Sequence, residues 1–138
     1  MPLPSIGSLT QYGEQLLLNA STGNGGTNVP SSLWLALYTV APTDTTAGTE
    51  VSGGAYLRQS MYFTEASGSP AVSTNITAVA FPASGGATAA WGIVTGFSLL
   101  DLPSGGNQIW WGYLNTPRTI NSGDSLDFSS SSIQLTMD

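Results

Sequence analysis

Asp124 and Asp127 are the closest pair of acids in this sequence. Glycosidases need no side-chain acids beyond two such carboxyl groups. The pair lies at a turn followed by a short strand, so alternation along the strand would point the two carboxyl groups apart. Asp124 also ends a Ser-Gly-Asp sequence, in which an aspartate has a structural use in the turn. We therefore expect no catalytic residue, with a glycosidase as the alternative.

The sequence lacks other residues on which catalytic sites commonly depend. Histidine and cysteine are absent from all 138 residues, which excludes a Ser-His-Asp triad, a Cys-His pair and the usual zinc sites. The glycine-rich run Gly23–Asn28 follows a helix and lacks nucleotide-binding spacing, so we interpret it as a plain loop. Asp44, Glu50 and Glu65 are expected in polar loops, where acids could bind calcium, although their spacing is not that of an EF-hand. A calcium site is therefore kept as an alternative. We expect no cofactor.

Charge is scarce and mostly negative. Charged residues make up 7% of the chain and the net charge is −6, which argues against nucleic acid and against anionic membrane surfaces as partners. The only cations are Arg58 and Arg118. Each is expected either in an ordinary ion pair or in a bond to a carboxylate of another subunit. A surface with so little charge is weakly protected against association, which is typical of a turn-rich β-protein or of a surface covered by partners.

The elements that must position these residues are mostly short strands. One helix is predicted over Ser8–Asn19, with Ser8 and Gln11 as a capping box. Alternating and apolar runs separated by Gly, Pro and Asn predict strands. They are Leu33–Val40, Ala55–Phe63, Ile76–Phe81, Trp91–Asp101, Gln108–Leu114, and two at Leu126–Phe128 and Ile133–Met137, after a turn at Asn121–Asp124. In the Trp91 strand, we expect Trp91, Ile93, Phe97 and Leu99 on one face.

This pattern predicts an all-β fold in a single domain over residues 1–138. Residues 1–30 form the helix and a loop, and residues 31–138 form seven to eight short antiparallel strands. Turns every 8–12 residues, approximately, are typical of a jelly-roll-like β-sandwich. The run from Leu33 to Val40 is apolar on both faces, so we expect a strand covered on both sides.

The stretch "QIWWGYL" places large aromatic side chains on both faces of one strand. Ile109, Trp111 and Tyr113 share one face, and Trp110, Gly112 and Leu114 share the other. One face enters the core, so the other needs a cover, because bare aromatic residues form an apolar patch. Three covers are expected as alternatives: the N-terminal helix, a neighbouring subunit, or a sugar.

Five blocks in this order resemble a family of small structural proteins of tailed phages. The blocks are "VPSSLWLALYTVAPT", "GTEVSGGAYLRQSMYF", "AWGIVTGFSLLD", "GNQIWWGYLNTPRTINSGDSLDF" and the terminal "IQLTMD". Family members are described as tail-fibre-like or head-decoration proteins. The sequence is also similar to the cement protein of a Bordetella-infecting short-tailed phage. The resemblance spans Leu9 to Asp138, with Ala41 where an acid is expected before the proline.

The resemblance implies a non-enzymatic cement protein on the outer surface of an icosahedral capsid. Its partners would be the major capsid protein and a second copy of itself, with a homodimer favoured over a trimer. The alternative is a tail-fibre or receptor-binding module that recognises host glycans. The first residues lack a positive start and an apolar run, so we expect synthesis in the host cytoplasm. The candidate interface residues are Trp34, Arg58, Trp110, Trp111, Tyr113 and Arg118.

Overall fold

The computed structural model describes residues 4–24 and 29–137, and these residues form ten strands and one helix. In chain order they are β1 (Ser5–Leu9), α1 (Gln11–Ser21), β2 (Leu33–Val40), β3 (Thr49–Glu50), β4 (Gln59–Met61), β5 (Ala71–Thr74), β6 (Val79–Phe81), β7 (Gly92–Leu100), β8 (Gln108–Ile120), β9 (Leu126–Phe128) and β10 (Ile133–Met137). Part of the expected glycine-rich loop, residues 25–28, lies outside the described residues.

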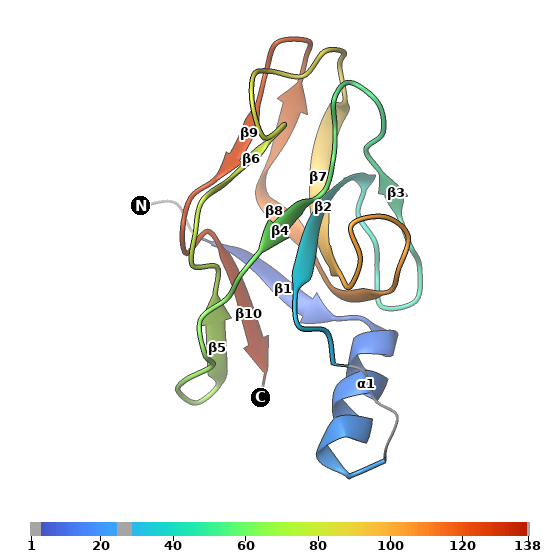
Figure 1. Cartoon of the computed structure of the whole chain (residues 1–138), viewed down its shortest axis with the longest axis vertical. Coiled ribbons are helices and arrows are strands. Elements are labelled where there is room, and N and C mark those ends of the chain that lie inside the picture. Colours follow the sequence, from blue (N-terminus) through green and yellow to red (C-terminus); the bar gives the residue numbers. More distant parts are fainter. Residues whose placement is uncertain (1–3, 25–28, 138) are drawn as a thin grey trace.

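The strands form two sheets of unequal size (Figure 1). The larger has the order β3-β2-β7-β8-β1-β10-β5, with β4 also paired to β2, and the smaller pairs β6 with β9. The pairing is antiparallel except between β1 and β10, which run parallel. The all-β sandwich with one short helix is therefore confirmed. The expectation that every strand is antiparallel is wrong, because the N-terminal segment inserts between β8 and β10.

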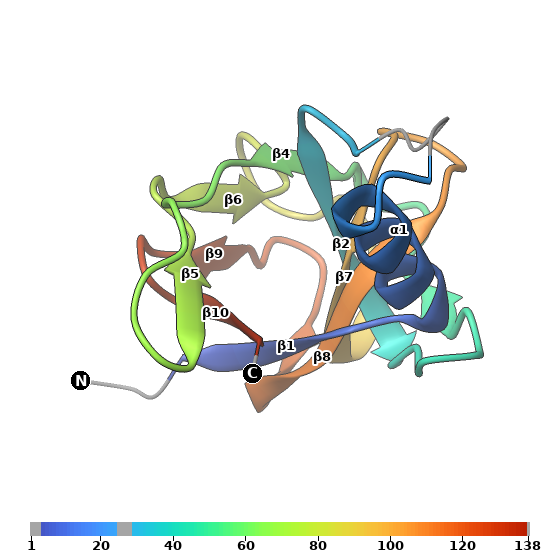
Figure 2. The same ribbon diagram turned by 90° about the horizontal axis from the view of Figure 1, so that it is seen from below.

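Figure 2 shows the strands arranged around a common interior. The chain after β4 reaches the chain around β5 through bridges from Phe63 to Asn75 and from Ser67 to Val72. The segment after β4, which pairs with β2, is therefore brought close to β5 at the other end of the larger sheet. Among the described residues, the strands at the ends are short, which leaves little edge for pairing with another protein.

Apolar side chains from both sheets fill the interior. The largest fully buried ones include Phe81, Phe97, Leu35, Leu37, Met61, Leu99, Ile120 and Ile133. β2 is covered on both faces, as predicted. Leu35 and Leu37 belong to the main core, whereas Ala36 and Tyr38 form a smaller buried cluster with Leu100.

The N-terminal segment differs from its prediction. Ser8 lies in β1 rather than at a helix start, so the capping box is wrong. The helix begins at Gln11, and Thr10 caps it by accepting a hydrogen bond from the backbone N–H of Gly13 at 3.0 Å. Residues 5–9 are drawn into the sheet because Gly7 faces Gly112, where neither residue carries a side chain to keep the strands apart. An added Cβ on Gly7 would lie 2.5 Å from Leu135.

Three other predictions were incomplete. Only Gln59–Met61 is a strand within Ala55–Phe63, and β5 forms in a stretch for which no strand was predicted. In β7, Phe97 and Leu99 are buried in the main core together with Trp91, as expected. Ile93 is exposed while Val94 is fully buried, so the prediction is wrong for Ile93. The register of β7 against β8 shifts between Val94 and Gly96, and this irregularity breaks the alternation.

Candidate binding surface along strand β8

The two adjacent indoles of β8 point to opposite sides of the sheet. Trp110 packs against the main core cluster, as does the buried Leu114. Trp111 lies on the outer face, where its Nε1 donates a hydrogen bond to Oδ1 of Asp44 at 2.8 Å. The outward surface of β8 is therefore the Trp111 side, and Trp110 contributes to the interior.

Trp111, which is half-buried, and Tyr113, which is exposed, form an aromatic pair on this outer face. Their rings meet edge to face, with centroids 5.6 Å apart and an interplanar angle of 77°, a favoured geometry for aromatic rings. Tyr113 is 60% exposed, and Ile6 of the neighbouring strand β1 is 49% exposed. The aromatic pair is thus held by its own contact while much of its apolar surface faces outward.

The outer face of β8 has different covers along its length. Ile109 is buried, and α1 lies against it so closely that a Cβ on Gly13 would meet the Ile109 carbonyl. The loop that carries Asp44 reaches over Trp111. Tyr113 has neither cover. The expected cover by the N-terminal helix is therefore found at Ile109, and it ends before the aromatic pair.

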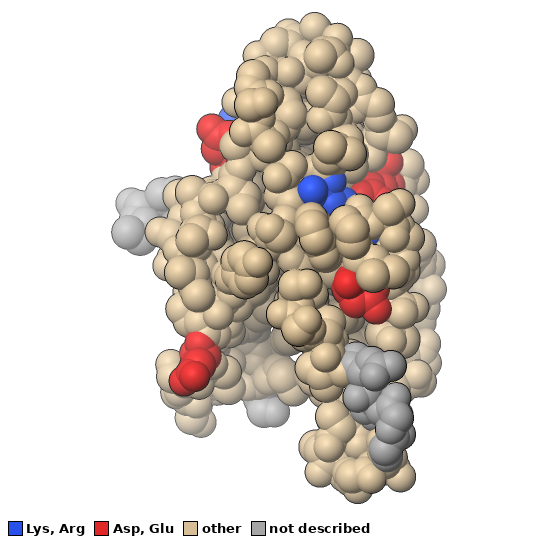
Figure 3. All heavy atoms as spheres, viewed as in Figure 1, with Lys and Arg blue, Asp and Glu red and all other residues tan. Residues whose placement is uncertain are grey.

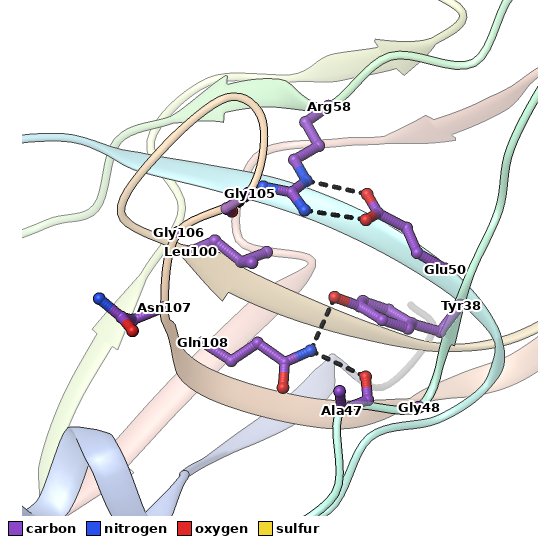
Figure 4. Close-up of a pocket in the computed structure, with 10 residues that line it drawn as sticks. All are labelled: Tyr38, Ala47, Gly48, Glu50, Arg58, Leu100, Gly105, Gly106, Asn107 and Gln108. Carbon is purple, nitrogen blue, oxygen red and sulfur yellow. Dashed lines mark hydrogen bonds and ion pairs between the residues drawn. The ribbon is translucent and has the colours of Figure 1, made fainter.

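A polar pocket of about 340 Å³ opens beside the start of β8 (Figure 4). It is lined by Tyr38, Ala47, Gly48, Glu50, Arg58, Leu100, Gly105, Gly106, Asn107 and Gln108. The Gln108 amide donates from Nε2 to the Tyr38 hydroxyl at 2.8 Å and to the Ala47 carbonyl at 2.9 Å. Burial raises the pKa of Tyr38, so its hydroxyl remains protonated at neutral pH. The pocket thus presents fixed polar groups beside the buried Tyr38.

One wall of this polar pocket is an ion pair between Arg58 and Glu50. Nε and Nη2 of Arg58 each donate to Glu50 at 2.8 Å, the two-bond geometry for which arginine is suited. Arg58 Nη1 also donates to the carbonyls of Leu102 and Gly105 at 2.9 and 2.7 Å. Arg58 therefore ties β3 to the loop before β8, and its guanidinium nitrogens are all engaged within the chain.

The ion pair keeps Glu50 charged. Burial alone would raise the pKa of Glu50, but hydrogen bonds from Arg58 and Tyr56 outweigh it, and the pKa is lowered from its ordinary value of 4.5. The same contact, opposed by burial, raises the pKa of Arg58. Burial and the hydrogen bond to Glu50 raise the pKa of Tyr56. The wall therefore holds one negative and one positive charge that offset each other.

A second cavity, of about 260 Å³, continues the polar pocket along the surface. We call it the hydroxyl groove, and it is lined by Thr10, Gln11, Tyr12, Thr43, Asp44, Thr45, Thr46, Ala47, Asn107 and Gln108. It shares Ala47, Asn107 and Gln108 with the polar pocket. Asp44, in turn, binds Trp111. The polar pocket, the hydroxyl groove and the aromatic pair are therefore adjacent along the outer side of β8.

A different kind of cavity lies between α1 and the end of β10. This apolar groove, of about 590 Å³, is lined by Leu9, Glu14, Leu17, Leu18, Ser21 and Met137. Leu18 is 65% exposed and Met137 is 42% exposed. In Figure 1, α1 projects from the lower end of the fold, beside the end of β10. The groove thus exposes aliphatic side chains at one end of the molecule.

The other predicted site residues lie in separate environments. Trp34 is half-buried on β2, opposite Leu100. Arg118 is exposed on β8, and its guanidinium group has no hydrogen bond or ion pair with another described residue. Of the six candidates, Trp111 and Tyr113 lie in ring contact with each other.

Asp124 has the structural use that its turn sequence indicated. Asp124 Oδ2 accepts a hydrogen bond from the Asn121 backbone at 2.9 Å, and the Asp124 N–H donates to the Asn121 carbonyl at 3.0 Å. Asp127 lies in β9, opposite Ala80, and is exposed. Among residues 4–24 and 29–137, no three metal-ligating side chains gather into a possible ion site.

Charged groups are sparse on the surface. On the face shown in Figure 3, acids and arginines form small separate groups on a mostly uncharged surface. Within the described ranges, no helix has the length and hydrophobicity needed to span a bilayer. The surface available for contacts is therefore dominated by uncharged polar and apolar groups.

Sequence reasoning did not find several residues of the polar pocket and the hydroxyl groove. Tyr38 was assigned to a covered strand, which is correct, but its hydroxyl reaches Gln108 across seventy positions of sequence. Asp44 was assigned to a polar loop, and no hydrogen-bond partner was predicted for it. Local spacing carries no signal for such contacts, because they depend on which strands become neighbours.

Comparison with known proteins gives one family. Residues 8–136 match the family described as "Podophage GP4 fiber I protein gp80". No curated protein matches the chain. The match covers nearly the whole sequence, including β8 and the two cavities beside it. The chain therefore belongs to the family of the podophage GP4 fibre I protein gp80, a family of phage structural proteins.

Proposed function

We propose that this protein is a non-enzymatic fibre subunit in the particle of a short-tailed phage. The match to a podophage fibre protein over residues 8–136 carries the proposal. The absence of histidine and cysteine from the sequence supports a structural rather than a catalytic role. So does the engagement of Glu50 in an ion pair and of Asp124 in a turn.

The apolar groove between α1 and β10 is the proposed attachment surface to the rest of the virion. Its lining is mainly aliphatic, and an exposed patch of this kind marks protein contacts. Glu14 is its one charged residue, and the chain carries a net charge of −6. The partner we propose is therefore another virion protein that presents apolar side chains beside a lysine or arginine. A second copy would bring Glu14 and the same negative charge, so the predicted homodimer is the competing occupant.

The proposal is tested by locating the chain in purified virions. Fibres separated from particles should contain it, and antibody against it should label the tail rather than the head. Finding it in tail-free heads, and not in fibres, would contradict the fibre assignment.

Capsid cement is the second candidate, and the compact fold favours it. The described residues form one short sandwich with no extended shaft, and a small unit of this kind is suited to bridging shell subunits. Several weak contacts made together would give firm attachment. In this case, particles that lack the protein would release DNA at a lower temperature than complete particles. An unchanged release temperature would count against cement.

A further inference from the structure

We propose that the polar pocket and the hydroxyl groove together bind a neutral oligosaccharide. The inference deepens the proposed function by naming a ligand class for an exposed surface of the fibre subunit. It depends on the proposed function only for its biological setting, because the binding itself is a property of the isolated chain.

The size of the two cavities suits a short chain of sugars. The polar pocket has a volume of about 340 Å³ and the hydroxyl groove one of about 260 Å³, and ligand pockets generally start at about 300 Å³. They meet at Ala47, Asn107 and Gln108. A ligand can therefore extend from one cavity into the other, as a linear oligosaccharide does.

A free hydrogen-bonding group in the polar pocket matches a hydroxyl group. The Tyr38 hydroxyl accepts from Gln108 Nε2, and the buried Ser98 hydroxyl is its second partner. Gln108 Oε1 has no donor among the described residues. Figure 4 shows the Tyr38 hydroxyl directed toward the Gln108 amide. A sugar hydroxyl can donate its proton to Gln108 Oε1, whereas an anion has no proton to donate.

The hydroxyl groove extends the same chemistry. Four threonines, one tyrosine and three side-chain amides line it, and Asp44 is its one acid. Tyr12 is 40% exposed, and its hydroxyl accepts a hydrogen bond from Asn107 Nδ2 at 3.4 Å. The ring is thus positioned with an open surface against which a sugar ring can pack.

The charges disfavour the competing ligand classes. Arg58 is neutralised by Glu50, and its remaining nitrogen donates to backbone carbonyls, so no free cation is left in the cavities for a phosphate or a uronic acid. A peptide that adds a strand needs a long open sheet edge. The nearest edge strand, β3, has two residues. A neutral polyhydroxylated ligand is therefore favoured.

Binding is tested with the purified full chain, labelled with ¹⁵N. The probes are maltohexaose, cellohexaose and chitohexaose, with hexagalacturonic acid as the acidic comparison. At about 10 mM, a site with a Kd of about 1 mM is mostly occupied. The account predicts that at least one neutral probe shifts the side-chain amide signals of Gln11, Asn107 and Gln108. It also predicts that the acidic probe does not shift them.

Two variants assign the binding to these cavities. Tyr12→Ala removes the exposed ring, and Tyr38→Phe removes the hydroxyl that holds the Gln108 amide in place. Each variant should raise the Kd about tenfold. Tyr62→Ala is the matched control, because Tyr62 is 56% exposed and lines neither cavity. Its Kd should be unchanged.

Three results would overturn the inference. They are no amide shift with any of the three neutral probes, equal binding of the acidic probe, or equal loss of binding in the Tyr62→Ala protein. These outcomes are distinct from failure of the proposed function, which depends on where the chain lies in the virion. A protein found on capsids could still bind the sugar, and a fibre protein could fail to bind it.

Discussion

The Nε1–H of Trp111 points at Oδ1 of Asp44, 2.8 Å away and sixty-seven positions earlier in the sequence. This bond fixes the loop between β2 and β3 over the outer face of β8. Asp44 also lies at the start of α1, where its carbonyl accepts a hydrogen bond from the Gln11 N–H. One short loop therefore joins the aromatic pair, the hydroxyl groove and the helix.

The two neighbouring indoles should differ in their contribution to stability. Trp110→Ala removes a ring packed on the core and should lower the free energy of unfolding by about 3 kcal/mol. Trp111→Ala loses one hydrogen bond and one edge contact, so its cost should be about 1 kcal/mol. Urea denaturation followed by circular dichroism measures both. Equal losses would contradict the assignment of the two indoles to opposite faces.

Acid should weaken the fold partly through Glu50. Its pKa is lower in the folded protein than its ordinary value of 4.5, so folding favours the carboxylate. Stability is then full above pH 4.5 and falls as the pH drops toward the folded pKa. Glu50→Gln should cost about 2 kcal/mol at pH 7 and make stability less dependent on pH below 4.5. Thermal melts from pH 3 to 7 test this, with Glu65→Gln, at an exposed glutamate, as the control. If stability depends on pH in the same way in the unmodified protein and in both variants, the prediction is refuted.

The contact between β1 and β8 requires glycine at position 112. A Cβ there would meet the Ile6 carbonyl and lie 2.7 Å from the Phe97 ring. Because the Ile6 backbone cannot move aside as a flexible side chain can, Gly112→Ala should lower the free energy of unfolding by about 3 kcal/mol or more. Ser8→Ala, on the exposed face of the same pair of strands, should cost less than about 0.5 kcal/mol. Chemical denaturation of both variants decides whether β1 docks as described.

Leu18 should matter for assembly and not for folding. It is 65% exposed in the apolar groove, so Leu18→Ser should leave the unfolding free energy within about 0.5 kcal/mol. If the groove attaches the protein to the virion, the variant should be incorporated into particles at a reduced level. Leu57→Ser, in an equally exposed leucine outside the groove, is the control. Equal incorporation of the two variants would move the attachment surface elsewhere.

Alternation and turn residues predicted much of the fold. The strand from Leu33 to Val40, its two covered faces and the turn at Asn121–Asp124 were all confirmed. The opposite orientation of Trp110 and Trp111 also followed from alternation alone. What failed was the segment before Thr10, because Ser8 fits a helix cap locally while its neighbour Gly7 allows a strand to pack against Gly112. Tertiary pairing decided between the two.

The candidate site was harder to predict than the fold. The aromatic pair was visible as residue types, but its link to Asp44 depends on a loop that folds back over the sheet. The choice between an internal and an intersubunit role for Arg58 could not be made from spacing. The structure gives it Glu50, eight positions away, together with two carbonyls near position 103 that no local pattern connects to it.

A reconstruction of the virion that carries this protein tests the central claim most directly. The account predicts that the sandwich fits density in a tail fibre, with Leu18 and Met137 buried against another virion protein and the hydroxyl groove open to solvent. Density for the chain only on the capsid shell, or none in the particle, would contradict it.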